Sequence, residues 1–201
     1  MNPELVLYAK ELSSKLPPEL DSVYVVNSGS EANDLAMMMA RVYTGSETVV
    51  GLRSCYHGMS IGTMGVTALH TWRYPIAPTG HIVHALTPDP YRYVASKRHS
   101  HVYLSSPRND LKDSFRVFRG LMGDRPDPYV QDLENLIQSS TCGKVAAFIH
   151  ESMQGMAGAV EFMPGYLSGA YKATRAAGGL CIADEVDFEY VASQYFSRSA
   201  L

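Results

Sequence analysis

The sequence lacks several features that would assign it to a class directly. It has 3 cysteines in 201 residues, with no Cys-x-x-Cys spacing between them: Cys55, Cys142 and Cys181. This pattern excludes a disulfide or zinc framework and is typical of reduced, buried thiols in an intracellular protein. No apolar run approaches the roughly 18 residues of a membrane span, so we expect no membrane association. The formal net charge of -3 is opposite to the basic footprint of nucleic-acid binders, and we expect no nucleic-acid partner.

The sequence does contain enough apolar residues for a globular core, with 46% hydrophobic and 18% charged residues. Strand-like and helix-like segments alternate along it. We expect strands at 22–27, 48–52, 144–150 and 180–183, and helices at 2–15, 31–43, around 130–137, and between Pro164 and Gly178. Residues 58–92 are expected to be mainly loop with short helical turns. This alternation predicts an α/β fold with a mostly parallel sheet flanked by helices.

The segment Asn27-Ser28-Gly29-Ser30-Glu31-Ala32-Asn33 joins the first expected strand to a helix. Its small residues allow close backbone approach, and either serine can cap the helix. The free amides and the positive dipole end of a new helix favour a phosphate or carboxylate. An ordinary capped helix explains the same residues without a ligand, so both interpretations stay open.

Other chemistry-bearing residues follow the expected strands. Tyr56, Glu151 and Asp184 fall with residues 28–30 at the carboxyl edge of a parallel sheet, where ligands bind. Asp184 could pair with a protonated ring nitrogen or cap a loop, and Tyr56 could stack on a flat ligand or pack on the core. Glu151 could face a substrate amine or pair with an arginine. For His57, a structural hydrogen bond is favoured over a role as base or ligand.

In this order the motifs resemble the class III, pyridoxal-phosphate (PLP)-dependent aminotransferases of fold type I. Within them the sequence looks most like the mitochondrial alanine-glyoxylate aminotransferase 2 group, particularly its plant-type members. The motifs are Val25 to Arg41, Tyr56-His57-Gly58, Asp89-Pro90-Tyr91-Arg92, Glu151 to Gly155, Pro164-Gly165-Tyr166-Leu167 and Gly178 to Val186. The resemblance covers most of residues 1–92 and 120–186.

The resemblance implies pyridoxal 5'-phosphate as cofactor and assigns its phosphate to Ser28, Gly29 and Ser30. It further implies that Tyr56 stacks on the pyridine ring, that Val186 supports the other face, and that Asp184 pairs with the ring nitrogen. Glu151 would lie on the substrate side. Small amino and keto acids would be the substrates, and the family implies a homodimer and a mitochondrial location, although no transit peptide is visible.

The sequence departs from the family pattern in three ways. The Schiff-base lysine is expected about thirty residues beyond Asp184 in that pattern, so we assign no catalytic lysine here. The N-terminal segment and the C-terminal small domain of the family are missing, so we expect truncation at both ends. Residues 93–119 are expected to be an insertion in a partial cofactor-binding large domain spanning 1–186, and 187–201 to be a divergent tail.

Three functional hypotheses remain open from the sequence. The first is an aminotransferase that moves an amino group from alanine or a similar donor to glyoxylate or another keto acid, with this chain inactive alone. The second is a non-catalytic isoform that binds cofactor weakly or pairs with a full-length subunit. The third is a nucleotide-phosphate module, which Ser28-Gly29-Ser30 would serve without the glycine-rich signatures of such sites.

Overall fold

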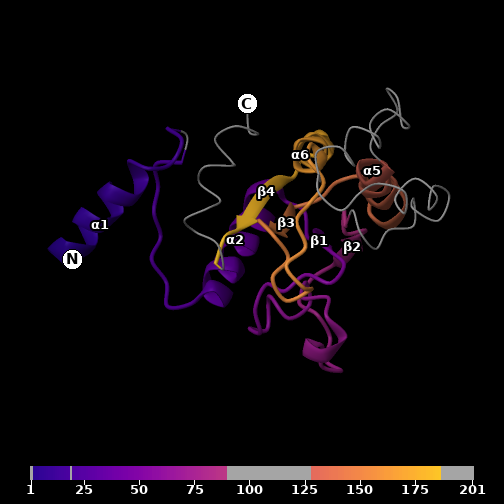
Figure 1. Cartoon of the computed structure of the whole chain (residues 1–201), viewed down its shortest axis with the longest axis horizontal. Helices are drawn as coiled ribbons and strands as arrows, with labels where there is room; N and C mark the ends of the chain where they lie inside the picture. Colours follow the sequence, from indigo (N-terminus) through magenta and orange to yellow (C-terminus); the bar gives the residue numbers. More distant parts are fainter. Residues whose placement is uncertain (1, 19, 90–127, 187–201) are drawn as a thin grey trace, which may run out of the picture.

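Four parallel strands form the centre of the molecule, which we describe from a computed structural model covering residues 2–18, 20–89 and 128–186. The strands lie in the order β2-β1-β3-β4 (Figure 1). Their bounds are Val49–Leu52 for β1, Ile82–Ala85 for β2, Ala147–Glu151 for β3 and Leu180–Asp184 for β4. Because all pairs are parallel, all four carboxyl ends lie at one edge of the sheet.

Helices cover both faces of this sheet. Helix α2 (Gly29–Thr44) packs Met37 and Ala40 against the face that carries Val49 and Ile149. Helices α5 (Pro128–Ser140) and α6 (Tyr166–Ala176) cover the face that carries Val50 and Phe148. Neighbouring strand residues thus point to opposite faces and both faces are buried, as in parallel α/β sheets. The α/β architecture expected from the sequence is confirmed.

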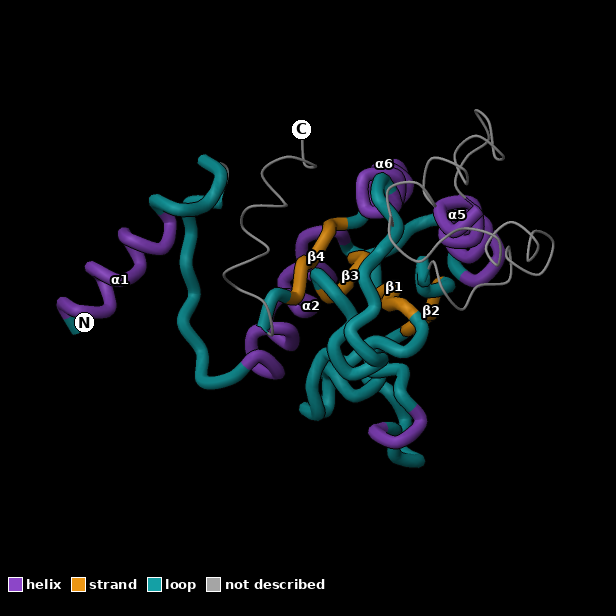
Figure 2. The backbone as a smooth tube through the Cα atoms, in the orientation of Figure 1, coloured by secondary structure: helices purple, strands orange, loops and turns teal. Residues whose placement is uncertain are grey.

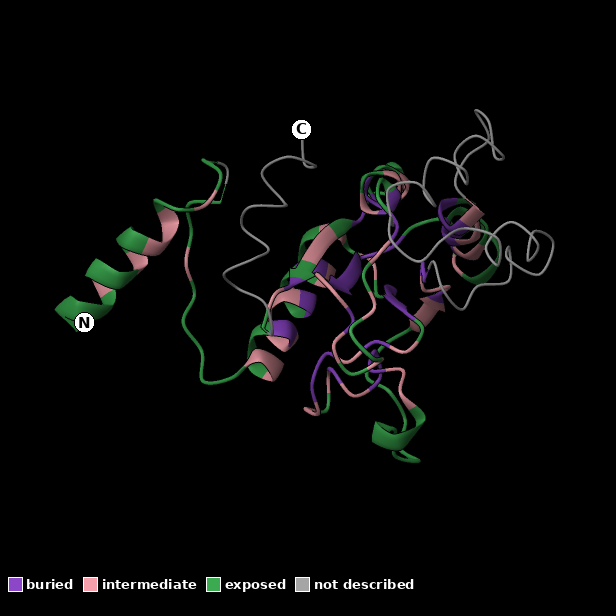
Figure 3. Ribbon diagram, viewed as in Figure 1, coloured by how far each residue is buried: buried purple, intermediate pink, exposed green. Residues whose placement is uncertain are grey.

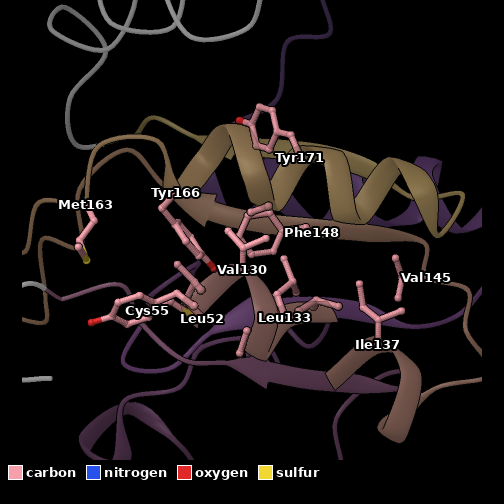
Figure 4. Close-up of a cluster of buried hydrophobic side chains, with 14 residues drawn as sticks. Leu52, Cys55, Val130, Leu133, Ile137, Val145, Phe148, Met163, Tyr166 and Tyr171 are labelled. Carbon is pink, nitrogen blue, oxygen red and sulfur yellow. The ribbon is translucent and has the colours of Figure 1, made fainter. Parts of the chain in front are cut away.

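The larger core cluster lies between the sheet and helices α5 and α6 (Figure 4). Phe148 of β3 and Leu133 of α5 both belong to this cluster, and each such buried side chain contributes about 1.5–3 kcal/mol. His150 lies two residues after Phe148 on β3, and its ring is buried. Its Nε2 atom lies 2.8 Å from the Tyr171 hydroxyl oxygen. This packing fixes the end of β3, and therefore Glu151, relative to α6.

Helix α1 (Pro3–Ser13) is confirmed as a helix. Its first turn is capped by the Asn2 side chain, which accepts a hydrogen bond from the Glu4 amide at 3.1 Å. It has no buried residue and lies apart from the sheet (Figures 2 and 3). Its apolar pattern therefore correctly predicts a helix, but not packing against the described part of this chain.

One secondary-structure prediction was wrong and a second was incomplete. Residues 22–26 have no regular secondary structure and Asn27 lies in a bend, so the expected strand 22–27 does not form. No described strand lies beside it to pair with, and the Tyr24 side chain is 68% exposed. Within the expected loop 58–92, residues 82–85 form strand β2 because they pair with β1 in register, Val49 opposite Ile82.

The cysteines are free, but they are not all buried. Cys55 is buried, Cys181 is partly exposed and Cys142 is exposed, because it follows the end of α5 in a surface turn. Within the described ranges no helix combines the length and apolar character needed to cross a bilayer. The expected insertion 93–119 and tail 187–201 lie outside the described residues.

Candidate active site

A cleft of about 560 Å³, open to solvent, lies at the carboxyl edge of the sheet, where β3 and β4 end and α2 begins. The lining residues are Ser28, Gly29, Ser30, Asn33, Tyr56, His57, Gly58, Glu151, Met153, Asp184 and Val186. The structure thus brings together all seven residues that the sequence proposed for the site.

The amino end of α2 forms one wall of the cleft. Ser28 is the N-cap, and its hydroxyl oxygen accepts a hydrogen bond from the Glu31 amide at 3.2 Å. The Glu31 carboxylate in turn accepts a hydrogen bond from the Asn27 amide at 2.7 Å. Two side chains therefore accept hydrogen bonds from backbone amides at the start of the helix. The amides of Gly29 and Ser30 have no carbonyl one turn earlier in the helix. They remain as donors for an anion at the positive end of the helix dipole.

This cap gives a first testable prediction. Replacing Ser28 with alanine removes the acceptor of the Glu31 amide, and we expect the free energy of unfolding to fall by about 1 kcal/mol. Ser28→Gly should cost only a few tenths of a kcal/mol, since glycine is tolerated at this position. Urea unfolding of both variants measures the difference, and an alanine variant as stable as the glycine variant would contradict the capping role.

Asp184 lies at the floor of the cleft and is held by two side chains. Its Oδ2 accepts hydrogen bonds from Asn33 Nδ2 at 2.7 Å and from His57 Nδ1 at 2.8 Å, all of them buried. Among the described residues, its Oδ1 accepts only the longer contact from the Val186 amide, at 3.3 Å. The carboxylate is therefore fixed through one oxygen, while the other keeps a lone pair for a further donor.

His57 and Asp184 form a buried ion pair. Burial opposes the charge on His57, but the Cys55 sulfur and the Asp184 carboxylate raise the pKa of His57 to about 10. The Cys55 thiol donates its hydrogen to the Val66 carbonyl at 3.0 Å, so the direction of this shift rests on the hydrogen bond to Asp184. Burial also opposes the charge on Asp184, yet His57 and Asn33 lower the pKa of Asp184. The structural hydrogen bond expected for His57 is confirmed.

Two glycines let the loops approach closely around the helix end. A Cβ on Gly29 would lie 2.6 Å from Val186 Cγ2, and a Cβ on Gly58 would lie 2.2 Å from the Ser30 hydroxyl oxygen. Ser30 also accepts a hydrogen bond from the Met59 amide at 3.3 Å. The segment after β1 is therefore seated directly on the first turn of α2.

Sequence reasoning gave no role to three residues of the cleft, Asn33, Gly58 and Met153. Asn33 was quoted in a motif without a role, although its side chain holds both Asp184 and the His57 carbonyl, the latter at 3.1 Å. A polar residue on the buried face of α2 was the available signal, since such a group needs a partner. Met153 carried no signal, because its place in the cleft depends on how the loop after β3 folds.

The donor set fits a phosphorylated pyridine. The helix end offers amides and hydroxyls for a dianion, Tyr56 offers a flat ring, and Asp184 offers a fixed carboxylate for a protonated nitrogen. Among the described residues no group of three or more His, Cys, Asp or Glu side chains is arranged to hold a metal ion.

Fold and cleft together define an α/β protein with a small-molecule site at the carboxyl edge of a parallel sheet. The family model described as "Aminotransferase class-III" matches residues 1–188, and the chain belongs to this family. It is 40% identical over 186 residues to alanine-glyoxylate aminotransferase 2 homolog 2, mitochondrial, of Arabidopsis thaliana. That match covers 92% of this chain and 33% of the relative, so the chain spans about a third of the relative's length.

Solved structures share the fold. An (S)-enantioselective omega-transaminase from Thermomicrobium roseum is 25% identical with a TM-score of 0.69, over 90% of this chain and 37% of that one. An amine transaminase from an uncultivated Pseudomonas species, solved in its PLP-bound form, is 22% identical with a TM-score of 0.70, over 92% of this chain and 39% of that one. The described sheet and helices are therefore part of a fold-type I aminotransferase large domain.

Proposed function

We propose that this chain forms the PLP-binding part of an aminotransferase that moves an amino group from alanine or a similar donor to glyoxylate or another keto acid. The observation that carries the proposal is Asp184, whose Oδ2 is held by His57 and Asn33 while Oδ1 stays available at the floor of the cleft. The names of the relatives support the choice of substrates and a mitochondrial location.

The residues of the cleft divide the binding between them. Gly29 and Ser30 donate their amides to the cofactor phosphate, and the hydroxyl hydrogens of Ser28 and Ser30 add two further donors. Tyr56 stacks on the pyridine ring and Val186 supports its other face.

Asp184 accepts a hydrogen bond from the ring nitrogen, and the imidazolium of His57 keeps this carboxylate ionised. When bound, PLP supplies an electron sink for the charge that develops on the substrate carbon.

The lining of the cleft contains no lysine among the described residues. We therefore expect a polypeptide with only these 201 residues to hold PLP by non-covalent contacts and to transfer no amino group alone. The alternative role is a non-catalytic isoform that binds PLP weakly or pairs with a full-length subunit, and a homodimer is the expected assembly of the full-length family.

A binding titration tests the proposal. PLP should bind the 201-residue chain reversibly, and pyridoxal, which lacks the phosphate, should bind at least about tenfold more weakly because the charge-assisted bonds at α2 are lost. With PLP, alanine and glyoxylate, pyruvate should not exceed a cofactor-only control. Equal affinity for pyridoxal would reject the phosphate site, and robust pyruvate formation would reject the non-covalent role of this chain.

A further inference from the structure

Glu151 and Asp184 lie side by side at the floor of the cleft. They are opposite each other in the register of β3 and β4, so both side chains leave the same face of the sheet. Their partners differ, however. Asp184 is held by side chains and keeps an oxygen available, whereas Glu151 is engaged by the backbone of two loops.

Both carboxylate oxygens of Glu151 accept backbone hydrogen bonds. Oε1 accepts from the Tyr56 amide at 2.8 Å, and Oε2 accepts from the Gly155 amide at 3.0 Å. The residue is only 6% exposed. Burial raises the pKa of Glu151 and the two amides oppose that rise, so the ionised form depends on these donors.

The two donors belong to the walls of the cleft. Tyr56 lines the cleft, so the bond to its backbone amide holds one lining residue in place. The bond from the Gly155 amide closes the turn that contains Met153, another lining residue. The Tyr56 ring also meets Trp72 edge to face, with centroids 5.7 Å apart and planes at 66°. Tyr56 is therefore held through its backbone by Glu151 and through its ring by Trp72.

We propose that Glu151 is a positioning residue, which fixes the Tyr56 and Met153 walls of the cleft against the cofactor ring through two backbone amides. This inference rests on the proposed PLP site and replaces the substrate-side role that the sequence suggested for Glu151. A substrate amine would have to compete for oxygens that the protein already uses, in a position with little exposure.

The test uses the whole 201-residue chain and two readouts that need no turnover. Trp72 is the single tryptophan of the sequence and touches Tyr56, so its emission reports on this wall and on quenching by bound PLP. Hydrogen exchange at the amides of Tyr56 and Gly155 reports on the clamp without cofactor.

In Glu151→Gln one amide keeps an acceptor and the other faces an NH2 group. We expect faster exchange at one or both amides and about tenfold weaker PLP binding. Glu151→Asp keeps the charge but is one methylene shorter, and it should weaken binding similarly. Glu134→Gln, an exposed change of the same charge on α5, is the matched control and should leave both readouts unchanged.

The outcomes separate the two roles. Wild-type exchange and PLP affinity in E151Q, with a loss confined to amino-acid binding, would overturn the positioning role. If Glu151→Asp kept wild-type exchange and PLP affinity, the charge of Glu151 and not the geometry of its two hydrogen bonds would matter. That result would overturn the positioning role as well. Failure of the wild-type chain to bind PLP would overturn the proposed site itself, and the exchange data would still show whether Glu151 holds the two amides. If E151Q does not fold, E151D decides the question through the same readouts.

Discussion

Asp184→Ala should destabilise the chain by about 3–5 kcal/mol, because it removes one partner of a buried ion pair. His57 and Asn33 would both lose the carboxylate oxygen that they share. PLP affinity should fall at the same time, since the ring nitrogen loses its acceptor. Urea unfolding at neutral pH measures the stability, and the exposed change Glu134→Ala should stay within about 0.5 kcal/mol of the wild type.

The pH dependence distinguishes an ion pair from simple loss of packing. The pKa of His57 is raised above 6.5, so its stabilising contribution is fully present below pH 6.5 and is lost as the pH rises through that raised pKa. The pKa of Asp184 is lowered, so its contribution is lost only in acid. The stability gap between wild type and Asp184→Ala should therefore narrow between pH 7 and pH 10. A constant gap over this range would contradict the ion pair.

The elements that the sequence predicted correctly are those whose signal is local. Helix α2 carries its cap, Ser28, and its buried stripe within one continuous segment, and strand β3 is a continuous apolar run. Such patterns identify an element without knowledge of its neighbours. The predicted helices and three of the four predicted strands therefore have counterparts in the structure.

The errors concern pairing, which is not local. Residues 22–27 have a β-branched, aromatic composition but no strand beside them, whereas 82–85 form β2 because β1 offers a partner. Strand propensity describes how a residue suits a pleated surface and does not supply the neighbouring strand. A residue whose role depends on a partner far away in the sequence is missed by sequence reasoning for the same reason.

The same distinction between local and long-range signals applies to the residues of the site. Ser28, Tyr56 and Asp184 were found because each stands at the end or start of an element. The hydrogen bond between Asn33 and Asp184 joins residues 151 positions apart. The two backbone amides that donate hydrogen bonds to Glu151 belong to separate loops. The sequence thus identified seven of the residues that line the cleft, while the proposed division into binding and positioning groups required the hydrogen bonds.

Gly58→Ala should be the second variant with a large effect, at about 2–5 kcal/mol. Gly58 has a φ of 108°, and its added Cβ would lie 2.2 Å from the Ser30 hydroxyl oxygen. Backbone strain and overpacking therefore combine. Because the clash falls on Ser30, a proposed phosphate-binding residue, PLP affinity should fall together with the free energy of unfolding, as titration and urea unfolding would measure.

Gly143→Ala separates the two causes, because Gly143 has a φ of 80° but nothing within 4 Å of its added Cβ. It should cost about 1–2 kcal/mol from backbone strain alone and leave PLP binding unchanged. The double variant Gly58→Ala, Ser30→Gly removes the clashing Oγ and Cβ and should recover stability relative to Gly58→Ala, but not cofactor affinity, since the Ser30 hydroxyl is lost. A Gly58→Ala variant no worse than Gly143→Ala would mean that the loop after β1 does not rest on the first turn of α2, and the cleft would lose the contact that joins its phosphate wall to its aromatic wall.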